Sequence, residues 1–584
     1  MKIWVPLFFA VLAGCVSTPT PKSADTSFQQ LTDAYLASHF AQRPLEAVAL
    51  GWHQYDGKFA IWDRAALEAE RENLKRFDAA LAALPSAQLS SPNRWDVRLL
   101  RASIAHDRWA IETQRAYAQN PMTYAGGLDV LIYFTRDFAP LHQRIRQAAA
   151  VLRHAPAWFA AARTNLDAVL PRPFVETAIE VAEGGVSFLE KEALAEARRA
   201  NDAAALAEFE AAQRVAVSEF KAFAAWLKSE KLPKASDRFA LGRAAFAQML
   251  RNDLIDQTPE EILEIGLREL RAEQARFVAA ARVIDPDKPA IEVFKAIQRE
   301  HPTAQGLIPD TRKNLEAIRQ FVVDHRIVTL PSEVRARVEE TPPPQRATSF
   351  ASMDTPGPFE TKATEAYYYV TPTEPQWPAA QKEEWLTAFN YYALDVTSIH
   401  EAYPGHYVQF LALNASAATR VKKIFATYAF VEGWAHYTEQ MLVDEGFGQC
   451  APDAPREAQV RAAKYRLEQS DEALLRLCRL CCAVKLHCQG ASVDDATRFF
   501  RENCYYEEKP ARSEATRGTF DPGYFAYTLG KLQILKLRRD WQAQEGAAFS
   551  LQRLHDELLR HGAPPLRMLR EVMLQDRALW KKTL

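Results

Sequence analysis

The sequence has almost no net charge: 72 lysine and arginine residues against 74 aspartate and glutamate residues leave a formal charge of −2 over 584 residues. It also has no stripe of basic residues interleaved with aromatic ones, so no nucleic-acid partner is expected. No internal repeat of solenoid length and no strong interior linker stand out. With 48% hydrophobic and 25% charged residues, the composition excludes a disordered chain or a coiled coil and indicates a large globular protein with an ample core.

The N-terminal segment MKIWVPLFFAVLAGC lacks an apolar run long enough to span a bilayer. One lysine followed by a short apolar run is typical of a signal peptide. The run ends in Leu12-Ala13-Gly14-Cys15, which is similar to a bacterial lipobox, in which the cysteine carries lipid after cleavage; an ordinary secretory signal is the alternative. We expect a lipoprotein signal peptide over residues 1–14, lipidation of Cys15 and a flexible Pro/Ser/Thr-rich tether over residues 15–30.

No aspartate follows the lipobox cysteine, so we expect a lipid-anchored protein of the cell envelope, at the outer membrane and facing the periplasm. Cysteine is otherwise scarce. The six that remain lie in one stretch of the C-terminal region: Cys450, Cys478, Cys481, Cys482, Cys488 and Cys504. An even count in an exported chain favours disulfides, although the sequence does not select their pairing. A thiolate metal cluster near His487 is the alternative, but the chain lacks the paired Cys-x-x-Cys spacing of a zinc ribbon.

Helical periodicity dominates from about residue 30 to residue 340. Within it, Thr258-Pro259-Glu260-Glu261 predicts a helix start, with a threonine cap, proline at the first helical position and glutamate three residues after the cap. Residues 341–377 instead contain seven prolines and the β-type run AYYYV. We expect a mainly α fold with a small β-sheet, an N-terminal helical region over residues 31–340 and a second region over residues 341–584, in one continuous globule.

The stretch HEAYPGH, residues 400–406, resembles a zinc motif with altered spacing. In the usual His-Glu-x-x-His helix, two histidines four residues apart face one metal. Here His400 and His406 are six apart, and a straight helix would separate them by about 240°. Pro404 and Gly405 must kink, bulge or end the helix. Such a rerouting can return His406 to the side of His400.

A third metal ligand is expected from the next helical stretch, FVEGWAHYTEQMLVDEGF. Glu432, His436 and Glu439 are spaced by four and three residues and share a helix face. A solvated helix face is the alternative, but Trp434 and the apolar flanks indicate a buried setting, in which carboxylates have partners. We expect Glu432 to be the ligand and His436 to act over the metal as a donor to substrate or in support of a ligand.

Three blocks in order, HEAYPGH, EGWAHYTE and a Pro-Gly followed by AYTLGKLQILKLR, resemble the bacterial domain-of-unknown-function 885 family. These proteins are often lipoproteins and are regarded as zincin-like metallopeptidases, and the resemblance covers nearly the whole mature chain. It implies a multi-helix zincin-like metallopeptidase fold with Zn²⁺ held by His400, His406 and Glu432. The chain departs from the family in RLCCAVKLH, which keeps only His487 of a common segment, and at Tyr524, where glutamine is usual.

The chemistry of such a site assigns further roles. Zinc lowers the pKa of water to about 7, and Glu401 is expected to be the general base that moves the proton. Tyr527 in the C-terminal block is the candidate donor to the oxyanion, by similarity to related zincins; a core aromatic is the alternative. Arg517 and Lys531 could capture a substrate carboxylate or could be plain surface charges.

The remaining candidates lie on the expected substrate side of the metal. His487 is the residue that the altered segment keeps, and Tyr368 lies in AYYYVTP. This run could pair with the backbone of a peptide by β-augmentation or could be an ordinary buried strand.

The sequence therefore predicts a zinc-dependent peptide hydrolase of the bacterial periplasm or cell surface. Its expected partners are a peptide substrate and the membrane, through the lipid anchor. A zinc amidase acting on cell-wall or small amides is an alternative, since the same three ligands would serve it. A non-catalytic lipid-anchored binding protein is another, against which the intact Glu401 argues. The sequence leaves the substrate, the cleavage mode and the oligomeric state open.

Overall fold

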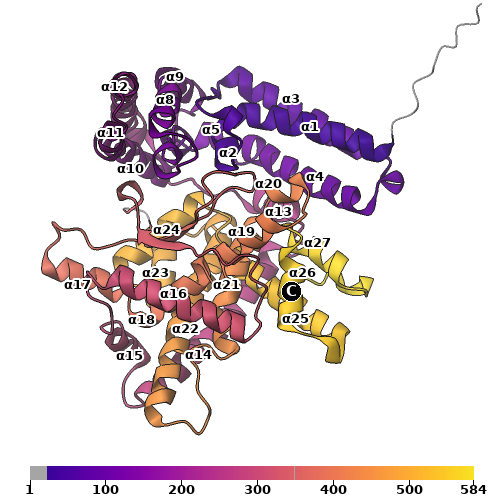
Figure 1. The fold of residues 1–584 in the computed structure, drawn as a ribbon, viewed down its shortest axis with the longest axis vertical. Coiled ribbons are helices and arrows are strands. Elements are labelled where there is room, and N and C mark those ends of the chain that lie inside the picture. The colour runs from indigo at the N-terminus through magenta and orange to yellow at the C-terminus, as the bar shows by residue number, and fades with distance from the viewer. Residues whose placement is uncertain (1–22, 347–348) are drawn as a thin grey trace, which may run out of the picture.

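The computed structural model describes residues 23–346 and 349–584 and is mainly helical with one small sheet, as predicted (Figure 1). The N-terminal helices form the upper part in that view, and the later helices form the body below it. The helices of the upper part are α1 (Ala24–Gln42), α2 (Pro44–Ala49), α3 (Arg64–Ala82), α4 (Ser91–Glu112), α5 (Ala116–Gln119), α6 (Met122–Ala125), α7 (Ile132–Thr135), α8 (Leu141–Leu152), α9 (Ala155–Asn165), α10 (Arg172–Phe188), α11 (Leu194–Arg198) and α12 (Ala203–Trp226).

The body begins with α13 (Arg243–Asn252), α14 (Pro259–Ile284), α15 (Ala290–Ile297) and α16 (Leu307–Asp324). After the sheet come α17 (Ala379–Thr387), α18 (Tyr391–Glu401), α19 (His406–Ala415), α20 (Arg420–Ile424), α21 (Tyr428–Asp444), α22 (Arg456–Cys488), α23 (Val493–Asn503), α24 (Glu508–Phe520), α25 (Ala526–Glu545), α26 (Leu551–Leu559) and α27 (Leu566–Met573). Short single turns are η1 (His53–Tyr55), η2 (Ser86–Gln88), η3 (Leu189–Ala193), η4 (Leu227–Lys231), η5 (Leu232–Lys234), η6 (Pro343–Gln345), η7 (Gly546–Ala548) and η8 (Arg577–Leu579).

Helix starts follow the local sequence signals. α14 begins as predicted: the Thr258 side chain accepts from the Glu261 N–H, the Glu261 side chain accepts from the Thr258 N–H, and Pro259 is the first helical residue. The tether predicted over residues 15–30 is too long, because α1 begins at Ala24. Ser23 caps that helix and Phe28 is buried, so the segment has an apolar face to pack.

The hydrophobic core crosses the boundary predicted near residue 340. One cluster of buried side chains joins α13, α14 and α15 to α22, α23 and α25, and α14 packs along α22. The two regions therefore share a core. No helix within residues 23–346 and 349–584 is long and apolar enough to cross a membrane.

Five of the six cysteines pack in or against this same core, and none of the six is paired. All six after the N-terminal segment are free, which corrects the expectation of disulfides. Cys478, Cys481, Cys482 and Cys504 are buried among apolar side chains and act as small hydrophobic residues there. No cysteine belongs to the group of metal-ligating side chains found in the described part of the chain, so the thiolate cluster is not present there either.

The sheet has three short strands in the order β1-β3-β2. They are β1 (Arg337–Glu340), β2 (Ala351–Asp354) and β3 (Tyr367–Val370). β3 lies in the run AYYYV, where a strand is predicted, and pairs in parallel with β1 and antiparallel with β2. β2 contacts α18, so this small sheet lies beside the HEAYPGH segment.

Candidate metal centre

The HEAYPGH segment ends one helix and starts the next. α18 ends at Glu401 and α19 begins at His406, so the two histidines belong to different helices. Gly405 comes so close to the end of α18 that an added Cβ would lie 1.8 Å from the His400 carbonyl oxygen. The indole N–H of Trp434 in α21 donates to the Pro404 carbonyl oxygen at 3.0 Å and so ties this loop to α21. The predicted interruption is therefore a full helix break, and it returns His406 to the side of His400.

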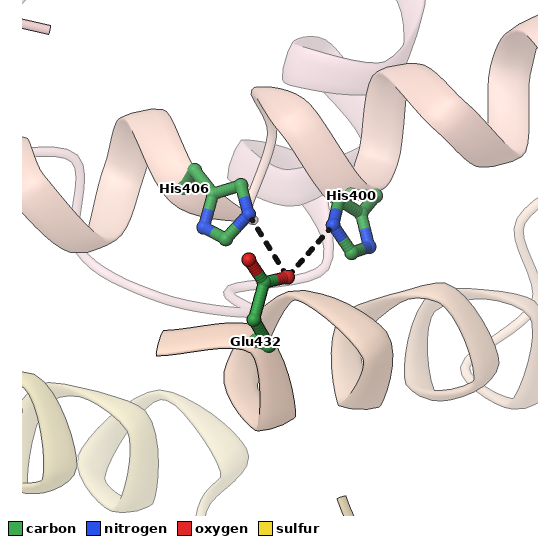
Figure 2. A group of neighbouring side chains, drawn as sticks. All are labelled: His400, His406 and Glu432. Carbon is green, nitrogen blue, oxygen red and sulfur yellow. Dashed lines mark ion pairs between the residues drawn. The ribbon is translucent and has the colours of Figure 1, made fainter. Parts of the chain in front are cut away.

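His400, His406 and Glu432 point toward one another from α18, α19 and α21 (Figure 2). The Glu432 Oε2 atom lies 3.5 Å from His400 Nε2 and 3.6 Å from His406 Nε2. The three ligand atoms all lie within 4.8 Å of one another, and the two imidazole rings are almost perpendicular, at 89°. Ligand atoms around a tetrahedral zinc ion are separated by about 3.3 Å. Two histidine nitrogens and one carboxylate oxygen are a zinc donor set.

Polar groups in this cluster fit a cation. Within the described residues the buried Glu432 Oε2 has no hydrogen-bond partner, and such an atom is costly unless something else satisfies it. Burial alone would raise the pKa of Glu432, but His400 and His406 hold it well below its usual value. Burial likewise opposes the charge on His400, yet Glu432 and Glu439 raise its pKa to about 10. Both pKa shifts mean that positive charge is stabilised at this position, which suits a cation.

A second buried carboxylate, Glu439, orients the first histidine. Its Oε1 lies 2.6 Å from His400 Nδ1, which turns His400 Nε2 toward Glu432. Its Oε2 lies 3.0 Å from His436 Nδ1, and Arg476 Nη2 lies 3.4 Å from Oε1. Burial would raise the pKa of Glu439, but Arg476 and the two histidines lower it far below the usual range. Glu439 therefore stays ionised and fixes the tautomer of His400.

Glu401 follows the first histidine and is partly exposed. Burial raises the pKa of its carboxyl group, against the opposing effect of His400 and His406. The backbone N–H of Met353, in β2, lies close enough to the carboxylate to lower this pKa in part. Glu401 therefore lies between the histidine cluster and the edge of the sheet.

Tyr527, at the start of α25, faces the cluster. Its ring stacks at 21° with that of His400, with 6.5 Å between centroids. The guanidinium carbons of Arg479 and Arg476 lie 5.2 and 5.7 Å from the centroid of the Tyr527 ring. In the described part of the chain the Tyr527 hydroxyl has no hydrogen-bond partner, whereas Arg479 donates twice to Glu514, at 2.7 Å each.

Arg517 is linked to Tyr527 through a second tyrosine, Tyr428. Its Nη2 donates to the Tyr428 hydroxyl at 3.1 Å and to Asp521 at 3.0 Å. The Tyr428 ring lies 5.6 Å from that of Tyr527, edge to face. Sequence reasoning did not find Arg476 or Arg479. Their spacing of three residues in α22 puts them on one helix face, which was the available signal.

Two glycines of the motif blocks bring α21 and α25 together. A Cβ on Gly433 would lie 2.5 Å from the Cα of Gly530, and a Cβ on Gly530 would lie 1.8 Å from the Ala429 carbonyl oxygen. Only glycine permits this approach of the two helix backbones. The crossing sets Tyr527 in α25 beside Tyr428 in α21.

Two further candidate histidines are engaged with the protein's own groups. His436 is fully buried behind Glu439, and burial together with the Lys531 charge lowers its pKa to about 3, so it supports Glu439 and does not reach a substrate. His487 uses both ring nitrogens on backbone groups, the Leu241 N–H at 3.3 Å and the Gly518 carbonyl at 2.8 Å, so it has none for a substrate. Burial lowers the pKa of His487 to about 4.

Tyr368 and the strand around it are also internal. The Tyr368 side chain is fully buried and its hydroxyl lies 3.1 Å from Ser398 Oγ in α18. β3 is the central strand, with both edges already paired, so it cannot add a peptide strand as the β-augmentation reading requires. Lys531 lines a cavity that contains none of the three cluster ligands. Cys15 lies outside the described residues.

Comparisons with known proteins agree with this fold. The chain matches no curated protein. It resembles the solved structure of a candidate lipoprotein of unknown function from Shewanella oneidensis, with a TM-score of 0.77 and 25% identity over 94% of this chain and 100% of that one. It also shares its fold with a candidate lipoprotein from Colwellia psychrerythraea, with a TM-score of 0.77 and 18% identity over 96% of this chain and 100% of that one. Residues 44–573 match the model of a family described as bacterial protein of unknown function, DUF885, and the chain belongs to this family.

Proposed function

We propose that the protein is a zinc-dependent peptide hydrolase with His400, His406 and Glu432 as the metal ligands. The observation that carries the proposal is the buried Glu432 Oε2, which has no hydrogen-bond partner in the described residues and faces two imidazole nitrogens at 3.5 and 3.6 Å. Hydrolases whose zinc is held by this set of ligands combine the metal, as a Lewis acid, with a nearby carboxylate base.

Glu401 is the general base in this proposal. Zinc, when bound, would supply a Lewis acid that polarises a carbonyl group and lowers the pKa of water to about 7. The Glu401 carboxylate takes a proton from the attacking water and passes it to the leaving amine. Its raised pKa supports this role, because a base that must also act as an acid works best with a pKa near the working pH.

Tyr527 is the proposed donor to the oxyanion. Its hydroxyl is free of partners within the described residues, and its ring stacks beside His400. The guanidinium groups of Arg476 and Arg479 over the ring favour negative charge nearby. Arg517, which contacts Tyr428 and pairs with Asp521, lies on the same side, and a substrate carboxylate bound there would share it with Asp521.

The edge of the sheet supports a peptide as the substrate. Thr371 N–H donates to the Phe350 carbonyl, so in the antiparallel pair the backbone groups of Ala351 and Met353 point away from β3. Within residues 23–346 and 349–584 no further strand pairs with this edge of β2. A peptide laid along it would reach Glu401, which already lies beside Met353.

An anchor in the cell envelope is proposed from two sources. Two proteins of the same fold are described as candidate lipoproteins. The lipobox-like sequence ending in Cys15 supports the same placement for this chain. Metabolic labelling with a fatty acid should mark the wild type and not the Cys15→Ser variant; equal labelling would contradict the anchor.

The test of the proposed activity is metal analysis combined with a digest of mixed peptides and small N-acyl amides, read by mass spectrometry. We expect about one zinc ion per chain and cleaved peptides from the wild type, and zinc without cleavage from Glu401→Gln. Glu457→Gln removes an exposed carboxylate at the start of α22 and is the matched control, with full activity expected. Undiminished cleavage by Glu401→Gln would refute the mechanism, and cleavage of the amides alone would replace the peptide substrate.

A further inference from the structure

A cavity of about 560 Å³ that is partly open to solvent lies between α14, α21, α22 and α25. The C-terminal residue also lines it. None of the residues that line it is a ligand of the candidate metal centre, nor is Glu401 or Tyr527 among them. A cavity of this size holds a small molecule.

Three polar groups in the wall of this cavity are buried without a satisfying partner. Lys531 is 5% exposed and, in the described part of the chain, makes no hydrogen bond and no ion pair. The hydroxyl of Thr528, one turn before it, is buried and has no hydrogen-bond partner there. The same holds for Oε1 of Glu273, whose Oε2 pairs with Arg276 at 3.0 Å. Burying such groups unpaired is costly, so their clustering in one cavity points to a bound polar molecule.

The unpaired groups have opposite character. An ammonium group at Lys531 seeks an anion, while the free carboxylate oxygen of Glu273 seeks a donor. These two groups therefore suit a molecule that carries both an anionic group and an ammonium group.

The rest of the wall is partly apolar. Ile265, Leu477, Leu532 and Leu535 also line the cavity. A ligand with a hydrocarbon side chain would bury that apolar surface, which favours binding. Among small molecules, an amino acid with an apolar side chain has all three features.

We propose that this cavity binds a free α-amino acid with an apolar side chain, with its carboxylate on Lys531, its ammonium group on Glu273 and its side chain against the leucines. The Thr528 hydroxyl donates to the same carboxylate. Charged side chains of both signs line the rest of the cavity, so its wall suits a zwitterion: Glu261, Glu264, Glu269, Arg268, Arg276 and Arg539.

The cavity adjoins the polar groups behind the metal ligands. The positive charge of Lys531 contributes to the lowered pKa of His436, and the negative charge of Glu439 acts in turn on Lys531. A carboxylate bound at Lys531 would weaken the electrostatic interaction between Lys531 and Glu439.

The test is calorimetric titration of the intact protein with L-leucine, which contains no peptide bond to hydrolyse. We expect saturable binding at one site per chain with a Kd of about 1 mM or tighter. On the same protein, 4-methylpentanoate lacks the ammonium group and 3-methylbutylamine lacks the carboxylate. Each should bind at least about tenfold more weakly, because each loses one charged hydrogen-bonded contact. Equal binding of either analogue would overturn the proposed orientation, and no heat with L-leucine would overturn the site.

Variants separate this cavity from the metal centre. Lys531→Met keeps an unbranched side chain of similar length and should weaken L-leucine binding at least about tenfold. The matched control is Lys536→Met on the same helix, whose ammonium group pairs with Asp540 outside the cavity and which should bind normally.

Glu432→Ala removes a proposed metal ligand and should leave L-leucine binding intact. The reverse pattern, with binding lost in Glu432→Ala and retained in Lys531→Met, would place the amino acid at the metal centre and overturn the proposal. These outcomes do not depend on peptide cleavage, so the proposed function can fail without this inference.

Discussion

Replacing Glu439 by glutamine tests whether the residue behind the ligands controls metal affinity. Glu439 is fully buried and accepts from His400 Nδ1 at 2.6 Å, from His436 Nδ1 at 3.0 Å and interacts with Arg476 at 3.4 Å. Glutamine keeps the shape and one acceptor oxygen but removes the charge. The charged hydrogen bond to His400 is worth about 1.5–3 kcal/mol, and each 1.4 kcal/mol is tenfold in affinity. We therefore expect the zinc Kd of Glu439→Gln to rise about 10- to 100-fold, as for other residues that support metal ligands.

The assay is competition for zinc against a chelating dye, with urea unfolding to establish that the variant is folded. Glu514→Gln is the matched control, since Glu514 also pairs with a buried arginine, Arg479, and contacts no cluster ligand within the described residues. Its zinc Kd should equal that of the wild type. A folded Glu439→Gln protein with a zinc Kd within about twofold of the wild type would refute the role assigned to this carboxylate.

Three further substitutions test other parts of the account. Gly433→Ala places a Cβ 2.5 Å from the Gly530 Cα and should lower the free energy of unfolding in urea by about 1–3 kcal/mol. In the control Gly184→Ala, in α10, the Cβ meets nothing within 4 Å, and the free energy of unfolding should rise by about 0.5–1 kcal/mol. Equal effects of the two substitutions would contradict the tight helix crossing. Burial raises the pKa of Asp395 to about 6, so the folded state holds a proton that the unfolded chain loses near pH 4, and stability falls as pH rises between these values. The stability advantage of Asp395→Asn over the wild type should therefore grow by about 3 kcal/mol from about pH 3.5 to pH 7. A difference in stability that does not change with pH would contradict this prediction. Tyr527→Phe should lower kcat about 100- to 1000-fold with zinc content unchanged, and an unchanged kcat would remove Tyr527 from the mechanism.

The convergence of His400, His406 and Glu432 could be predicted from sequence because its signals are local. The spacing of His400 and His406 and the break at Pro404-Gly405 lie within seven residues, and Glu432 stands near the start of the next long helix. Local rules also gave the start of α14 at Pro259 and the strand β3. Each of these depends on hydrogen bonds or backbone conformations that neighbouring residues decide.

The surroundings of the cluster depend on contacts between distant segments. The support of His400 by Glu439 was not predicted, although both residues were noted, because it requires the crossing angle of α18 and α21. Arg476 and Arg479 reach Tyr527 only through the packing of α22 against α25. Tyr368 has the composition of a strand, but whether a strand is central or at the edge is decided by its partners, here β1 and β2.

Buried polar residues were the least predictable. His487 looked like a functional histidine, and it instead links the backbone at Leu241 to that at Gly518. The cysteines looked like disulfide partners from their even number, but a core helix also uses cysteine as a small apolar residue. Composition does not separate these uses, because they differ only in which distant groups lie alongside.

The most direct test of the central claim is to locate zinc in crystals of the protein by anomalous scattering at the zinc absorption edge. The account predicts one strong peak per chain, bound by His400 Nε2, His406 Nε2 and Glu432 Oε2 at about 2.0–2.2 Å. The peak should vanish in Glu432→Ala crystals grown in the same way. Zinc bound at another position, or no peak between these three residues in zinc-loaded protein, would contradict it.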